Sequence, residues 1–173
     1  AGMLILGGSG WRLEGSLLDY EIPTTIQGVI NDRIGRLSSG SRSILQEASV
    51  IGREFSTRLL QAMSRNAAEI GSCMDEVERL GLVRSQYDRG ETSYVFNHVV
   101  TQEVVYESML SKERRELHER VGQAIEYLFS DRLQEFCETL AFHYKNGLSH
   151  AKAIDYLMEA ADKSWRQIGR AHV

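Results

Sequence analysis

The chain has 173 residues, of which 42% are hydrophobic and 25% charged, and its formal net charge is −4. This size and composition fit a helix-rich globular protein with one ordinary hydrophobic core or two small ones. The acidic balance argues against binding driven by nucleic-acid phosphates, which normally needs a concentrated basic surface. No apolar run is long enough for a membrane span, and no secretory leader is recognisable. Cys73 and Cys137 fall on apolar helix faces, which favours buried thiols over a disulfide, so we expect a cytoplasmic setting.

Both ends of the chain are expected to be accidental boundaries. The sequence starts with Ala1 rather than Met, inside what reads as a running segment. Residues 168–173 resemble translated sequencing-adapter sequence, and an ordinary basic helix end is the alternative. We therefore expect an internal piece of a longer protein and leave 168–173 out of the fold reasoning.

Residues 1–38 are expected to form a short hairpin and one helix, as a connector at the end of a larger domain. Met3–Leu6 and Trp11–Leu13 flank four residues rich in glycine, which predicts two strands and a turn. A phosphate-binding loop is not expected there, because the spacing and the lysine that such loops need are missing. Pro23 and the two threonines after it predict a helix start, and the apolar period runs on to Leu37.

Residues 39–98 follow the element order of a winged-helix domain. Three short helices are predicted, the second capped by Ser56. Leu82–Ser85 and Tyr94–Asn97 predict two strands, joined by a polar stretch that turns at Gly90. Three helices followed by a β-hairpin indicate a winged helix. The helices carry their apolar residues at Ile44, Leu45, Ala48 and Ile51, at Leu59, Leu60 and Met63, and at Ile70, Cys73, Met74, Val77 and Leu80.

The rest of the chain is expected to be helical, so the fold class is mainly α with a small β-hairpin. Residues 99–130 predict two linking helices, Thr101–Leu110 and a longer one that Ser111 caps. Residues 131–167 predict an α-helical hairpin with Asn146 and Gly147 between its helices. A tetratricopeptide-like repeat is indicated by the spacing Leu140-Ala141-x2-Tyr144-x8-Ala153-x3-Leu157-x2-Ala160, and a generic helical hairpin is the alternative.

The second helix of this hairpin has a clean amphipathic face. The apolar residues follow helical spacing at Ile154, Leu157, Met158, Ala161 and Trp165. A single repeat cannot bury its own apolar face well, so we expect further repeats downstream.

No catalytic or metal constellation is expected from the residue pattern. The five histidines show no metal-ligand spacing with another His or with Cys, and no nucleophile motif is present; they are His98, His118, His143, His150 and His172. The helix that would enter a DNA groove carries four acidic residues, Glu69, Asp75, Glu76 and Glu78, against the single basic Arg79. We interpret the acidic residues as a solvated helix face and do not expect DNA binding.

Four segments in order resemble one family. They are Ile22-Pro23-x2-Ile26-x3-Ile30-x2-Arg33-Ile34-x2-Leu37, Leu45-x2-Ala48-Ser49-Val50-Ile51-Gly52-Arg53-Glu54-Phe55, Phe96-x-His98-x4-Glu103-x2-Tyr106-x2-Met109-Leu110 and Leu140-Ala141-x-His143-Tyr144. Together they resemble the multidomain STAND-class signalling ATPases that accompany adenylate or guanylate cyclases, protein kinases or LuxR-type regulators in bacteria. The resemblance covers about residues 1–167.

The resemblance implies a regulatory segment of an ATP/ADP-switch ATPase. In that family the nucleotide site, with its Mg, lies in a domain upstream of the winged helix, so the parent protein would be the ATPase and this chain alone would not be catalytic. The implied partners are the upstream nucleotide-binding domain, the downstream repeats and a protein partner at the repeats; nucleic acid and membranes are not expected.

His98 is the candidate cofactor-binding residue that the resemblance implies. It follows the second predicted strand, like the winged-helix histidine of related switch ATPases that faces the β-phosphate of ADP. An imidazole can donate a hydrogen bond to a phosphate. The alternative is a histidine that caps or packs at a strand-to-helix junction, and Val99 stands where the related motif often has aspartate. Glu103 and Tyr106 would be structural. The alternative function is a winged-helix DNA-binding transcriptional regulator with a helical sensor extension.

Overall fold

The structure is a computed structural model that describes residues 3–7, 10–14, 24–88 and 90–170. The chain divides into two compact units, residues 1–36 and residues 37–173. No helix in the described part of the chain is both long and apolar enough to cross a membrane. Residues 171–173 of the expected adapter-derived end lie outside the described residues.

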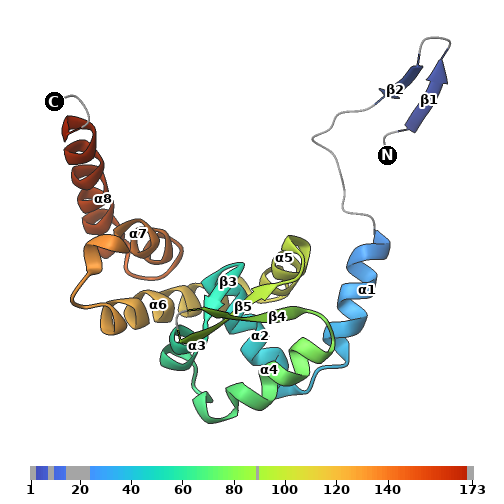
Figure 1. The fold of residues 1–173 in the computed structure, drawn as a ribbon, viewed down its shortest axis with the longest axis horizontal. Helices are drawn as coiled ribbons and strands as arrows, with labels where there is room; N and C mark the ends of the chain where they lie inside the picture. The colour runs from blue at the N-terminus through green and yellow to red at the C-terminus, as the bar shows by residue number, and fades with distance from the viewer. Residues whose placement is uncertain (1–2, 8–9, 15–23, 89, 171–173) are drawn as a thin grey trace. The chain divides into compact units, whose positions relative to one another are not determined.

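The first unit contains the expected hairpin and helix (Figure 1). Strands β1 (Met3–Gly7) and β2 (Gly10–Glu14) pair antiparallel, with Met3 opposite Glu14. Helix α1 spans Thr24–Gly35, and the exposed carboxylate of Asp32 accepts from Arg36 at 2.7 Å. The hairpin and the helix are therefore confirmed.

The second unit begins with three helices whose ends the sequence marks well. Helix α2 spans Ser39–Ile51, α3 spans Thr57–Met63 and α4 spans Ile70–Arg79, after a 3-10 turn at Ala67–Glu69. The Ser56 hydroxyl accepts a hydrogen bond from the Leu59 N–H at 3.2 Å, as an N-cap should. Gly81, just after α4, has a φ of 69°, which favours glycine. The expected apolar faces of these helices supply most of their buried residues.

The expected two-stranded hairpin is part of a three-stranded antiparallel sheet. Strands β4 (Val83–Asp88) and β5 (Glu91–Phe96) pair as far as Asp88 opposite Glu91, so both run closer to the turn than predicted. The sequence analysis did not predict β3 (Glu54–Ser56). This strand pairs with the edge of β5 opposite to β4, which gives the order β3-β5-β4. Three residues are too few to show an alternating pattern, and the strand is held by the buried ring of Phe55 against Tyr94 and Phe96.

The remaining elements are helical, as expected. Helices α5 (Val99–Glu107) and α6 (Ser111–Leu128) precede a 3-10 turn at Leu133–Glu135, and α7 (Cys137–Asn146) and α8 (His150–Arg170) follow. Ser111 is not the cap of α6: Leu110 occupies that position, and its backbone N–H donates to the Glu113 carboxylate at 3.1 Å. The cap therefore comes from the carboxylate at the third helical position.

One apolar cluster joins the elements of the second unit. It is formed by residues of α2, α3, the link between α5 and α6, and helices α6 to α8: Val50, Leu59, Met63, Met109, Val121, Ala124, Ile125, Leu140, Tyr144 and Ala153. Helix α6 approaches α7 at Gly122, where an added Cβ would lie 2.8 Å from Cζ of Tyr144. Cys73 and Cys137 are buried free thiols, as predicted.

Candidate functional sites

His98 lies at the junction where β5 ends and α5 begins. It is the N-cap residue of α5, but its imidazole makes no capping hydrogen bond, and the backbone carbonyl instead accepts from the Thr101 N–H at 3.0 Å. The residue is exposed. A side-chain capping role is therefore ruled out, and the contact with a nucleotide phosphate stays a prediction.

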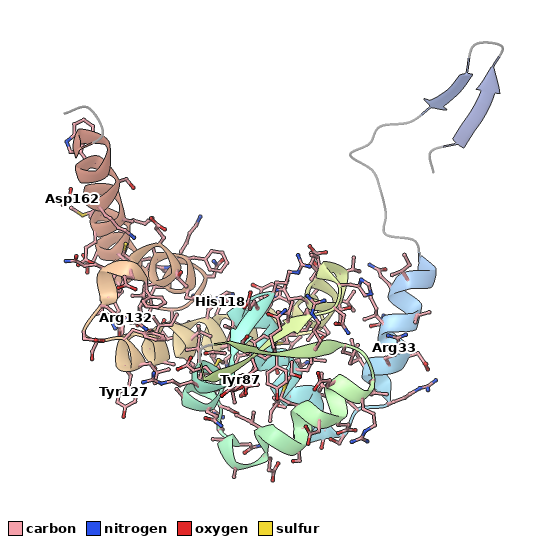
Figure 2. All side chains as sticks on the ribbon, viewed as in Figure 1. Arg33, Tyr87, His118, Tyr127, Arg132 and Asp162 are labelled. Carbon is pink, nitrogen blue, oxygen red and sulfur yellow. The ribbon has the colours of Figure 1, made fainter. Side chains whose placement is uncertain are left out.

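A buried pair of imidazoles, which the sequence analysis did not predict, lies between α6 and α7. His118 on α6 and His143 on α7 are each 1% exposed, and their Nδ1 atoms lie 2.9 Å apart. The Tyr106 hydroxyl on α5 lies 3.0 Å from Nε2 of His118, and the edge of the Phe142 ring packs against both imidazoles. Figure 2 labels His118 within the second unit. Three helices thus meet at one hydrogen-bonded chain of side chains.

Burial keeps both imidazoles neutral near neutral pH. Burial, with a smaller contribution from the positive charge of Arg114, lowers the pKa of His118 to about 4. Burial and then the neighbouring His118 lower the pKa of His143 to about 3. In the neutral pair, one Nδ1 donates to the other, and the Tyr106 hydroxyl completes the chain.

This pair was missed because the search for histidine sites looked for metal-ligand spacing. The two histidines are separated by 25 positions and meet only because α7 folds back along α6. A usable signal was present, since His118 lies between the apolar Leu117 and Val121 on the predicted stripe of α6. Within the described residues, no group of three or more His, Cys, Asp or Glu side chains could hold a metal ion.

A polar cavity of about 380 Å³ lies between α2, the residues after α3, and α6. Buried Glu47 lines it and accepts from Arg120 Nη2 at 3.2 Å, and Arg120 also donates to the Met63 carbonyl. The second carboxylate oxygen of Glu47 is buried with no hydrogen-bond partner among the described residues. A buried ion pair of this kind is weak evidence for stabilisation, because removing both charges from water offsets their attraction.

Polar contacts also lock α8 to α6. Glu126 accepts from Lys152 at 2.8 Å and from the Tyr156 hydroxyl at 2.7 Å. Burial would raise the pKa of Glu126, but these hydrogen bonds outweigh it and lower the pKa. Glu119 accepts from the backbone N–H groups of Leu148 and Ser149, both at 3.0 Å, just before α8 begins. The helical hairpin is thereby fixed in register on α6.

The sequence analysis interpreted the acidic residues around α4 as a solvated helix face, but two of them make specific hydrogen bonds within the unit. Glu76 accepts from the N–H and hydroxyl of Ser38 at 3.0 and 2.8 Å and from the Ser41 hydroxyl, so it helps to hold the start of α2. Glu78 accepts from the N–H and hydroxyl of Ser85 at 2.7 and 2.8 Å on β4. Two of the four acidic side chains therefore connect α4 to other elements, Glu76 to the start of α2 and Glu78 to β4.

Helix α8 exposes most of the apolar face that the sequence predicted. The exposed fraction is 60% for Ile154, 52% for Leu157, 65% for Met158 and 80% for Trp165. The buried side of α8 carries instead the small residues Ala153 and Ala160. A row of exposed large apolar residues of this kind is typical of interaction surfaces.

Comparisons with known proteins add little to these observations. No family model and no solved structure matches the chain. An uncharacterized protein from Rhizobium meliloti (strain 1021) is 25% identical over 104 residues, which are 59% of this chain and 10% of that protein. The chain thus spans about a tenth of the relative's length, and the printed description of the relative gives no activity.

Proposed function

We propose that this chain is the regulatory winged-helix and repeat segment of a multidomain ATP/ADP-switch ATPase. The segment relays binding at the repeats to a nucleotide site, with ATP or ADP and Mg held by a domain upstream. The proposal rests first on the position of His98, an exposed imidazole that β5 and α5 present without a capping bond of its own. A side chain in that state is available to another domain.

The order of the elements supports the winged-helix part of the proposal. Helix α2, strand β3, helices α3 and α4, and the hairpin β4–β5 follow one another, and the first strand pairs with the last. This is the arrangement expected of a winged helix, in which the hairpin forms the wing. His98 then stands directly after the wing.

The α7–α8 hairpin supports the repeat part. Ala141, Ala153 and Ala160 are all buried, as expected for the small residues between the helices of such a repeat. Leu157, which belongs to the same spacing and was expected to fill between the helices, is 52% exposed. The exposed stripe of α8 is the face that a further repeat would cover. The downstream repeats and the upstream nucleotide-binding domain are thus the proposed partners within the same chain.

The competing function, a DNA-binding transcriptional regulator, finds less support in α4. In such regulators, the helix before the wing brings basic and amide side chains to the bases. Here Asp75 is exposed on that helix. The carboxylates of Glu76 and Glu78, on the same helix, accept hydrogen bonds from serine hydroxyls. Their charge would oppose approach to phosphates.

The test compares the natural full-length protein with its His98→Ala variant. We expect His98→Ala to weaken ADP binding by about tenfold or more in calorimetry, because one charge-assisted contact to the phosphate is lost. His150→Ala, which removes another exposed histidine, is the matched control and should bind ADP like the wild type.

Two results would overturn the proposal. One is an unchanged ADP affinity in the His98→Ala protein; the other is a full-length protein with no nucleotide-binding domain before this segment. Tight binding of duplex DNA to the present chain at 150 mM salt would favour the transcriptional regulator instead.

A further inference from the structure

The hydrogen-bonded chain Tyr106–His118–His143 is a buried titratable cluster that the proposed function leaves unused. It takes one side chain from each of α5, α6 and α7, with contacts of 3.0 and 2.9 Å. Each contact needs one hydrogen atom between its two heavy atoms. The geometry therefore depends on how many protons the two imidazoles hold.

The proton count of the neutral pair matches these contacts. When each imidazole carries one proton, one Nδ1 donates, the other accepts, and Nε2 of His118 exchanges one hydrogen bond with Tyr106. One additional proton can still be accommodated, because a protonated Nδ1 can donate to a bare one. A second additional proton places a hydrogen on both Nδ1 atoms, which lie 2.9 Å apart and would then repel each other.

Among the described residues, the charged group that influences the pair is the positive Arg114, and no carboxylate is bonded to either imidazole. From α6, the guanidinium of Arg114 lies over the Tyr106 ring at 5.0 Å and adds positive charge. From α7, the neighbour is the uncharged Phe142 ring. The nearby carboxylate of Glu119 is occupied by Leu148 and Ser149 at the start of α8, and that of Glu47 on α2 by Arg120. Neither carboxylate faces the imidazoles as a partner.

We propose that Tyr106, His118 and His143 form an acid-released latch, which ties α5 and α6 to α7 while both imidazoles are neutral and opens when both are protonated. The first half of α5 has a separate attachment, since Gln102 donates to the Ser49 carbonyl on α2 at 2.7 Å. The opening is therefore local: the end of α5 and the α6–α7 contact loosen, while α2 and the sheet stay in place.

The latch does not depend on nucleotide binding. Its consequence for the nucleotide switch rests on the proposed function. Because Gln102 keeps the first half of α5, and with it His98, attached to α2, acid would act on the switch through the α6–α7 contact, which joins the repeat to the rest of the unit. Local opening can be measured on the present chain without nucleotide, so failure of the latch and failure of the proposed function are distinguishable.

The experiment is native-state hydrogen exchange followed by mass spectrometry at pH 7 and pH 5, with rates corrected for the intrinsic effect of pH. Opening that takes up two protons is favoured by up to about 100-fold per pH unit below the ordinary histidine pKa. We expect corrected exchange in residues 137–146 and 103–109 to rise at least about tenfold at pH 5. Residues 39–51 of α2, which open only when the whole unit unfolds, serve as the internal reference and should stay more strongly protected than residues 137–146 at both pH values.

Variants separate the latch from general acid sensitivity. His143→Asn keeps a polar side chain without a titratable ring, so α7 should exchange faster at pH 7. Its pH dependence should fall to at most about tenfold per pH unit, because only His118 still titrates. His150→Asn, at an exposed position, is the control and should behave like the wild type. Wild-type rates that do not change with pH, or a His143→Asn variant with the wild-type pH dependence, would overturn the latch.

A second measurement covers the case in which His143→Asn does not fold. Carbon-13-labelled histidine in the wild type reports the protonation of each ring by NMR. Signals of His118 and His143 that remain neutral down to pH 5 are expected, whereas titration of both near pH 6.5, as for an exposed histidine, would contradict the latch.

Discussion

Helices α4 and α8 have the same kind of apolar stripe in the sequence but opposite environments in the structure. The stripe of α4 is inside, with Met74 and Val77 both fully buried. The stripe of α8 is outside, with Met158 at 65% exposure and Trp165 at 80%. Periodicity therefore identifies a helix and its apolar side, but it does not say whether the partner of that side lies within the same unit.

The difference comes from the small residues. Helix α8 reaches its neighbours through Ala153 and Ala160, whose short side chains allow close packing, and the tie is completed by the Lys152–Glu126 ion pair. The large apolar residues of α8 therefore stay exposed and can contact a partner outside this unit. Under the proposed function, that partner is a further repeat. The four predictions below test or refine this contrast, from the largest expected effect to the smallest.

A pair of identical truncations tests the contrast directly. Met74→Ala removes a fully buried side chain from α4 and should lower the free energy of unfolding by about 2–5 kcal/mol. Met158→Ala makes the same chemical change on the exposed face of α8 and should change it by less than about 0.5 kcal/mol. Urea unfolding of the present chain measures both. Equal effects would mean that the α8 stripe is covered in solution, for example by self-association.

Acid should destabilise the fold through the buried imidazoles. The pKa values of His118 and His143 are lowered to about 4 and about 3 in the folded chain, so the unfolded chain binds more protons between those values and about 6.5. Stability is therefore full above about pH 6.5 and falls as the pH drops to 5, by a loss on the order of 3 kcal/mol.

Urea titrations at a series of pH values measure this slope. His143→Asn should flatten it, and His150→Asn should leave it unchanged. A wild-type stability that is constant between pH 7 and pH 5 would show that the two imidazoles are not buried as neutral groups.

A glycine pair compares close packing on α6, where a neighbouring helix lies near, with open space on α4. Gly122→Ala places a Cβ 2.8 Å from Cζ of Tyr144 and should cost about 1–3 kcal/mol, because α6 and α7 must move apart. Gly71→Ala on α4 meets nothing within 4 Å and should stabilise the chain by up to about 1 kcal/mol. Thermal unfolding monitored by circular dichroism compares the two. Stabilisation by both substitutions would contradict the close approach of α6 to Tyr144.

The sequence predicts the helices well because their signals are local. The Ser56 cap, the apolar period of α4 and the stop at Gly81 each depend on residues within one or two turns. Strand β3 was missed because it exists only through its pairing with β5, about 40 residues later in the chain. The candidate site divides in the same way: the place of His98 after a strand was readable, whereas the His118–His143 contact depends on how α7 folds back on α6.

The smallest expected effect concerns a helix end, where local signals and structure agree. Ser56→Ala removes the hydroxyl that accepts from the Leu59 N–H and should lower the free energy of unfolding by about 1 kcal/mol. Ser56→Asp keeps an acceptor at the N-cap and should come within about 0.5 kcal/mol of the wild type. Helix α3 is only seven residues long but places Leu59, Leu60 and Met63 in the interior. An Ala effect as large as that of Met74→Ala would show that the cap organises this packing rather than merely satisfying one N–H group.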